Sequence, residues 1–242
     1  MRRYGRAAVV LVAVSIVVGV LLTHTAWAAE AAADVEGERT FLDNIKAGGA
    51  VGYTIILLSV AGLALMIEHA VSLRREKLIP PYLLSELENL FDEEEYEEAM
   101  DLCDQEDAML CRVVGAGLAK IGGGYAQMKE AIEEVSEEEA TNLTQKISYL
   151  SLVSGIAPML GLLGTVQGMI KAFDKIAVMR GALNPSDLAE SISMALITTL
   201  LGLLVAIPTT AGYMFFRNKV MKLSQEASAI TGELIDRFRR VE

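Results

Sequence analysis

Residues 157–169 read Ala-Pro-Met-Leu-Gly-Leu-Leu-Gly-Thr-Val-Gln-Gly-Met and lie inside an apolar run that extends from about residue 147 to 173. Such a run is long enough for a helix that crosses a bilayer, which needs about 20 residues. Positions three and four apart share one helix face. One face here holds only small, hydroxyl-bearing or proline residues, namely Ser154, Pro158, Gly161, Thr165, Gly168 and Ala172. The other face is bulky, which predicts a transmembrane helix with two unlike sides.

A second apolar run, residues 188–216, repeats this arrangement. Its small face consists of Ser191, Ala195, Thr199, Gly202, Ala206 and Thr210. Two interpretations of the small faces stay open. Gly164 and Gly168 form a GxxxG pair, which favours close packing of helices in a membrane. Thr165, Thr198 and Thr199 instead indicate a weakly polar internal surface, for which a lipid-facing helix has no use.

An earlier apolar run, residues 50–73, is followed directly by Arg74, Arg75 and Lys77. The positive-inside rule places this end of the run in the cytoplasm. Arg217, Lys219 and Lys222 mark a second basic end after the last run. The predicted fold is an all-α integral membrane protein with three long transmembrane helices. Its parts are spans 50–73, 147–173 and 188–216, a cytoplasmic helical section 74–146, a periplasmic loop 174–187 and a cytoplasmic C-terminal helix 217–242.

The N-terminus has the three parts of a secretory signal in residues 1–29. Arg2, Arg3 and Arg6 precede an apolar core, and Ala26-Trp27-Ala28 resembles a cleavage site. We expect either cleavage or retention as an anchor, and both outcomes place the lead-in, residues 30–49, in the periplasm.

The polar section between the first two spans is acidic. Its pattern predicts one helix from Leu83 to Cys103, a second near residues 110–121 and a third from about Ala126. The formal net charge of −11 argues against nucleic-acid binding. The section shows no metal-ligand spacing and no paired nucleophile and base. The sequence therefore predicts a protein that is not an enzyme and needs neither cofactor nor metal.

No carboxylate or histidine lies in the middle of the second or third span. Glu190 lies near the outer end of the third span, and Glu68 and His69 lie near the inner end of the first. We expect Glu68 and His69 to reach the interface by snorkelling rather than to form a buried relay. Proton transport needs a titratable group in the low-dielectric zone. Either the protein moves no protons, or a partner supplies the carboxylate.

The stretch 157–169 resembles the APLLGLLGTVxGM signature of the ExbB/TolQ branch of the MotA/TolQ/ExbB proton channel family. Residues 192–208, which contain Met194-Ala195-Leu196-Ile197-Thr198-Thr199, are similar to the third span of that family. The exit of the first span, from Ile67 to Arg75, is also similar. Together these segments cover most of residues 50–220.

The resemblance implies a channel subunit that forms a homo-oligomer, a pentamer, in the bacterial inner membrane. A single-span ExbD/TolR-like partner would provide the membrane aspartate, and a TonB- or TolA-like periplasmic protein would receive the work. Thr165 and Thr199 would be pore hydroxyls facing that aspartate. On this basis the expected pore-lining residues are Thr165, Thr199, Thr198, Ser191 and Ser154. The expected helix-packing residues are Gly161, Gly164, Gly168, Gly202, Pro158 and Pro208.

One position departs from the family pattern: Met194 stands where many members have a glutamate. If that glutamate admits protons, its role here passes to Glu190, one turn earlier. The alternative to a channel is a non-conducting membrane scaffold whose small-residue faces only pack helices together.

Overall fold

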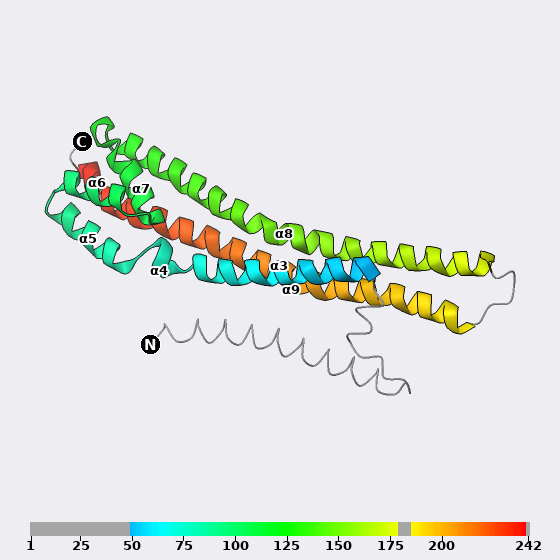
Figure 1. Ribbon diagram of the computed structural model, residues 1–242. Coiled ribbons are helices and arrows are strands. Elements are labelled where there is room, and N and C mark those ends of the chain that lie inside the picture. The colour runs from blue at the N-terminus through cyan, green and yellow to red at the C-terminus, as the bar shows by residue number, and fades with distance from the viewer. Residues whose placement is uncertain (1–48, 179–184, 241–242) are drawn as a thin grey trace, which may run out of the picture. The chain divides into compact units, whose positions relative to one another are not determined.

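The computed structural model describes residues 49–178 and 185–240, and the regular structure within them is helical (Figure 1). The long helices are α3 (Gly49–Ser72), α8 (Tyr125–Val178) and α9 (Pro185–Ile235). The shorter elements are α4 (Arg75–Leu78), α5 (Pro81–Asp92), α6 (Tyr96–Gln105), α7 (Met109–Leu118), η1 (Ile121–Gly123) and η2 (Phe238–Arg240). The predicted all-α fold is confirmed for this part of the chain.

Each long helix contains a stretch that is long and apolar enough to cross a membrane. These helices include the three predicted spans. Large apolar side chains on their outer faces are exposed. On α3 more than half of the surface of Leu57, Val60, Leu63, Ile67 and Val71 is exposed. Apolar surface of this extent is unfavourable in water, so the fold is consistent with a multi-pass membrane protein.

The helix ends differ from the predicted boundaries. Helix α8 continues to Val178, into the segment predicted as a loop, and α9 begins at Pro185. The C-terminal helix ends at Ile235 and is followed by a turn and η2, so it does not extend over all of 217–242. The predicted signal, residues 1–29, the lead-in up to residue 48 and loop residues 179–184 lie outside the described residues.

The described residues form two compact units. The first comprises residues 49–56 and Met159–Leu204, apart from 179–184, and contains Thr165 and Thr199. The second comprises Leu57–Pro158 and residues 205–240 and contains α4 to α7.

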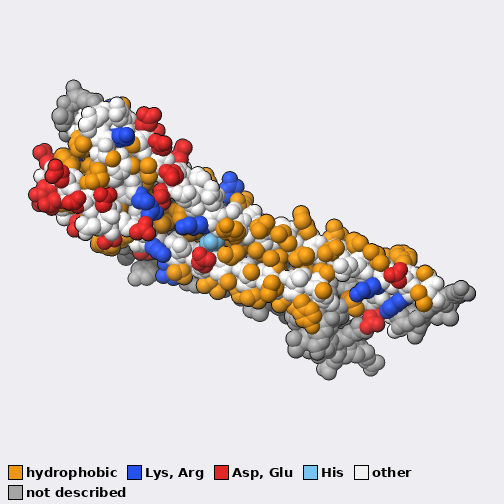
Figure 2. Space-filling view, turned by 45° about the horizontal axis from the view of Figure 1, so that its top comes forward, with side chains coloured by type: hydrophobic (Ala, Val, Ile, Leu, Met, Phe, Trp, Pro, Cys, Tyr) orange, Lys and Arg blue, Asp and Glu red, His pale blue; other side chains and the backbone are white. Residues whose placement is uncertain are grey.

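The second unit has a hydrophobic core because its helices repeat apolar residues every three or four positions. On α5, Leu83, Leu87 and Phe91 are at most 1% exposed. Helix α7 is buried on most sides and supplies Met109, Leu110, Cys111, Val113, Val114 and Leu118 to the same core. The acidic side chains gather on the outer surface of the short helices (Figure 2). This division between an apolar core and an acidic surface is that of a water-exposed helical section.

The single acidic helix predicted from Leu83 to Cys103 is wrong. The structure has two helices, because α5 ends at Asp92 and the left-handed residue Glu94 (φ 62°) precedes α6. The break lets Phe91 of α5 pack against Tyr96 of α6, with ring centroids 5.7 Å apart. Like charges gather at the break, where the pKa of Glu95 is raised, chiefly by the charge of Glu98. The break also places Glu97 and Glu98 in the first turn of α6, where the helix dipole stabilises negative charge.

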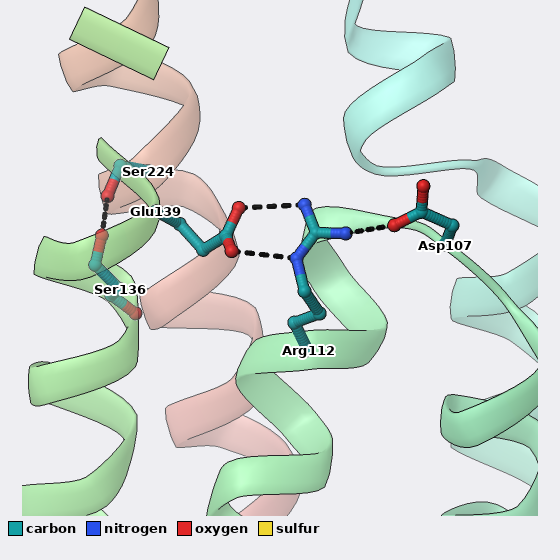
Figure 3. Close-up of polar contacts among 5 residues, drawn as sticks. All are labelled: Asp107, Arg112, Ser136, Glu139 and Ser224. Carbon is teal, nitrogen blue, oxygen red and sulfur yellow. Dashed lines mark hydrogen bonds and ion pairs between the residues drawn. The ribbon is translucent and has the colours of Figure 1, made fainter. Parts of the chain in front are cut away.

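An ion pair joins α7 to α8 in the second unit (Figure 3). Nε and Nη2 of Arg112 donate to the two carboxylate oxygens of Glu139, each at 2.7 Å, and Nη1 donates to Asp107. The Glu139 side chain is only 12% exposed. The hydrogen bond to Glu139 is the main cause of a raised pKa of Arg112. A bidentate pair of this kind fixes orientation as well as distance.

Replacing Arg112→Gln should therefore destabilise the second unit. The change leaves the largely buried Glu139 carboxylate without its main partner, at a cost of about 1–3 kcal/mol. Thermal unfolding in detergent, followed by circular dichroism, measures this loss. The matched control is Lys129→Gln, which breaks an exposed pair with Glu133 at 3.8 Å and should cost no more than about 0.5 kcal/mol. Equal melting temperatures for the two variants would contradict the assignment.

Candidate functional site

The small-residue faces of α8 and α9 meet within the first unit. A Cβ atom added to Gly161 would lie 2.9 Å from Cα of Thr199 and 3.0 Å from the carbonyl oxygen of Thr198. A Cβ atom on Gly168 would lie 2.6 Å from Cβ of Ala195. No residue with a side chain fits such contacts without a shift of the backbone. The two helices therefore approach each other closely at Gly161 and Gly168.

Thr198 fills the space that Gly164 leaves open. Its side chain is 2% exposed, and a Cβ atom on Gly164 would lie 2.2 Å from its hydroxyl oxygen. That hydroxyl donates to the carbonyl of Ala195 at 2.7 Å, with a longer contact of 3.4 Å to the carbonyl of Gly161. Within one chain, Thr198 thus lies between the two helices.

Thr199 and Thr165 have different surroundings. The hydroxyl of Thr199, which is half-buried, donates across to the carbonyl of Gly161 at 3.1 Å. The hydroxyl of Thr165, also partly exposed, donates to Leu162 of its own helix at 2.7 Å. Both oxygens keep lone pairs that can accept a further hydrogen bond. Thr165 is therefore the hydroxyl that can take a new partner without losing a contact to α9.

The remaining predicted residues do not all lie in the first unit. Ser191 and Gly202 are buried in the first unit. Ser154 and Pro158 of α8 and Pro208 of α9 belong to the second unit, where the Ser154 hydroxyl donates to Ser151 of its own helix at 2.8 Å. The first unit thus contains Thr165, Thr198 and Thr199 together with Gly161, Gly164 and Gly168, whereas Ser154 and the two prolines belong to the second unit.

A pocket of about 320 Å³ lies between the C-terminal end of α8 and the N-terminal end of α9. Glu190 and Met194 both line it, one turn apart on α9. The remaining lining residues are Gly168, Lys171, Asp174, Lys175 and Ser191. The sequence singled out Glu190, but it did not predict that two lysines and an aspartate share its pocket. The spacing of Gly168, Lys171 and Lys175 along one face of α8 was the available signal.

The expectation that His69 snorkels to the interface is wrong. His69 is 4% exposed, its ring packs against Phe216 with centroids 5.8 Å apart, and its Nε2 atom has no hydrogen-bond partner within the described residues. Glu68 is exposed. The cause is the packing of α9, because His69 lies on the same side of α3 as the buried Gly62, and Phe216 of α9 packs against this side.

Replacing Gly161→Ala should loosen the helix pair. The added methyl group meets the backbone of α9, which cannot rotate away, and overpacking of this kind costs about 1–3 kcal/mol. The control is Gly155→Ala in the same helix, where an added Cβ atom meets nothing within 4 Å and helix propensity should gain up to about 1 kcal/mol. Melting temperatures in detergent compare the two. A Gly161→Ala protein as stable as the Gly155→Ala protein would contradict the close approach.

Known proteins with similar sequences are transport proteins. Residues 105–229 match the MotA/TolQ/ExbB proton channel family. The chain is 29% identical over 183 residues to a putative biopolymer transport protein ExbB homolog of Methanothermobacter thermautotrophicus, covering 75% of this chain and 64% of that protein. It is 26% identical over 195 residues to a putative ExbB-like protein 3 of Synechocystis, covering 80% and 93%.

A shorter match joins the chain to the biopolymer transport protein exbB1 of Vibrio cholerae, at 40% identity over 76 residues, which are 31% of this chain and 33% of that protein. The chain thus spans less than two thirds of the Methanothermobacter and Vibrio relatives. The family match covers the close-packed part of α8 and α9. The chain belongs to the MotA/TolQ/ExbB proton channel family, in its ExbB-like branch.

Proposed function

We propose that this chain is the channel-forming subunit of an energy-transducing complex driven by the proton-motive force, of the ExbB/TolQ kind. Several copies, five by analogy with the family, would surround a single-span ExbD/TolR-like partner. The membrane aspartate of that partner would carry the proton. The resulting movement would act on a TonB- or TolA-like periplasmic protein and so power a transport or envelope process.

The observation that supports this proposal best is the Thr165 hydroxyl on the close-packed α8–α9 pair. Thr165 is partly exposed and bonded only to Leu162 of its own helix. A rigid helix pair holds that oxygen in place, and preorganised polar groups stabilise a proton carrier without reorganisation. The second and third spans contain no mid-span carboxylate or histidine of their own. A hydroxyl surface without a titratable group fits a carboxylate that a partner supplies.

The hydroxyl residues that were predicted to line the pore have different roles in this proposal. Thr165 and Thr199 face the partner in our proposal. We assign Thr198 to helix packing, because its side chain is 2% exposed within one chain and cannot reach a pore without separating α8 from α9. Ser191, which is 5% exposed, and Ser154 would support the helices from within.

The proposed route for protons begins at the pocket that contains Glu190. Glu190 lies one turn from Met194, the position at which many family members have a glutamate, and both side chains line the same pocket. A carboxylate at position 190 could therefore serve the same pocket. Lys171 and Lys175, which line the same pocket, would keep it hydrated.

The proposed orientation follows the basic residues. Arg74, Arg75 and Lys77 after α3, and Arg217, Lys219 and Lys222 in α9, would lie on the cytoplasmic side of the bacterial inner membrane. In this orientation the pocket at Glu190 would lie on the periplasmic side. The polar section 74–146 and the C-terminus would lie in the cytoplasm, and residues 30–49 in the periplasm.

A second candidate is a non-conducting scaffold. One observation favours it: the contacts of Gly161, Gly164 and Gly168 already account for the small-residue face of α8 by packing within one chain. That account leaves the Thr165 hydroxyl without a role. The scaffold therefore predicts that Thr165 tolerates valine, which has nearly the same shape.

Replacing Thr165→Val should strongly reduce transport that depends on the proton gradient. The Thr165 hydroxyl can rotate away from the carbonyl of Leu162 and donate to the partner's ionised carboxylate. A hydrogen bond to a charged group contributes about 1.5–3 kcal/mol, so the rate should fall by about 10- to 150-fold. Uptake in cells that carry only the variant measures this loss. Thr165→Ser restores the hydroxyl and should recover most of the activity.

The matched control is Thr144→Val on α8, in the polar section. Its hydroxyl also bonds only to its own helix, at 2.7 Å from the carbonyl of Ala140, and uptake should be unchanged. Native gel analysis in mild detergent shows whether each variant still assembles. Wild-type uptake in Thr165→Val would favour the scaffold over the channel.

Replacing Glu190→Gln should slow proton-driven transport by about tenfold or more, because a positioned proton-transfer group is lost. The double variant Glu190→Gln/Met194→Glu moves the carboxylate one turn along α9 within the same pocket, and it should recover activity. Glu134→Gln, an exposed acid of the polar section, serves as the control. Failure of the double variant together with normal activity of Glu190→Gln would remove Glu190 from the route.

A further inference from the structure

Basic side chains gather in the second unit at the edge of the hydrophobic surface (Figure 2). Arg74 follows α3, and Lys219 lies in α9 just beyond the predicted span. Arg75 pairs with Glu226 at 2.7 Å. Within residues 49–178 and 185–240, the other basic residues of this edge form no ion pair with a carboxylate. These residues are Arg74, Lys77, Arg217, Lys219 and Lys222.

Arg74 and Lys219 follow the contact between the His69 and Phe216 rings, whose centroids are 5.8 Å apart, by five and three residues respectively. The pKa of Lys219 is lowered, mainly by burial and further by the positive charge of Arg74, whereas Glu76 opposes the shift. Burial, the largest cause, thus deprives the half-buried ammonium group of Lys219 of solvation. An anion bound beside Lys219 would compensate for this loss.

The surface next to this pair of cations is apolar. On α3, Ile67 is 59% and Val71 is 53% exposed, and Val71 precedes Arg74 by three residues. On α9, Phe215 is 47% exposed and precedes Lys219 by four residues, on the same helix face. Two cations above two exposed apolar stripes match an amphiphile with an anionic head and long tails. A free phosphate ion would leave the stripes uncovered.

We propose that Arg74 and Lys219 bind the phosphate of an anionic phospholipid in the adjoining leaflet, with its acyl chains lying along Ile67, Val71 and Phe215. Basic residues at the membrane surface each contribute about 1 kcal/mol of attraction to anionic lipid, or about fivefold in affinity. Two of them should give a preference of about 25-fold over a zwitterionic lipid. The site depends on the membrane insertion of α3 and α9 and not on proton conduction.

The test is native mass spectrometry of the full-length protein in mild detergent, titrated with dioleoyl phosphatidylglycerol or dioleoyl phosphatidylcholine. We expect the wild type to bind phosphatidylglycerol about 25-fold more tightly. In Arg74→Gln/Lys219→Gln this preference should fall to about twofold or less. The exchange Arg74→Lys/Lys219→Arg keeps both charges and should keep the preference.

The matched control is Lys120→Gln/Lys129→Gln, which removes two exposed charges from the polar section and should leave the preference intact. Circular dichroism and the oligomer mass show that each variant is folded. Three outcomes would overturn the proposal: no preference in the wild type, an unchanged preference in Arg74→Gln/Lys219→Gln, or displacement of the lipid by millimolar inorganic phosphate. Loss of the oligomer in that variant, with lipid preference unchanged, would assign Arg74 and Lys219 to a contact between copies instead.

Discussion

The close approach of α8 and α9 at Gly161 is the constraint on which the candidate site depends. Inside a membrane the hydrophobic effect does not hold helices together, and packing and hydrogen bonds must do so. Gly161 contributes to both, since its missing side chain admits the backbone of Thr199 and its carbonyl accepts the Thr199 hydroxyl at 3.1 Å. A fixed helix pair in turn fixes Thr165. The function that we propose needs such a fixed oxygen, because a mobile hydroxyl would lose its advantage over water.

The second unit is stabilised by other forces. Its core excludes water from Leu83, Leu87 and Phe91, and burial of apolar surface is the dominant favourable term in such a region. The Arg112–Glu139 pair adds orientation between α7 and α8 rather than bulk stability. The chain therefore combines a part held by backbone contact with a part held by a hydrophobic core, as expected for helices that continue from lipid into water.

Much of the fold could be predicted from sequence because apolar runs and helical spacing are local signals. The small face of α8 was visible in the spacing of Gly161, Gly164 and Gly168. What the spacing could not supply was which hydroxyl faces the neighbouring helix: Thr198 and Thr199 are adjacent, yet one is buried against Gly164 and the other is half-buried. The position of His69 was misjudged for the same reason, since its burial depends on α9. The break at Glu94 was missed because helical spacing does not reveal a left-handed residue, and the packing of Phe91 against Tyr96 across the break is a tertiary contact.

The central claim is that this chain forms a channel that lacks its own proton carrier. The direct test is proton flux into liposomes that contain the purified full-length chain, alone or with a single-span partner that bears one membrane aspartate. The account predicts little flux for the chain alone, a clear increase with the partner, and loss of that increase when the partner's aspartate is changed to asparagine. Equal flux with and without the aspartate, or no flux in any combination, would contradict it.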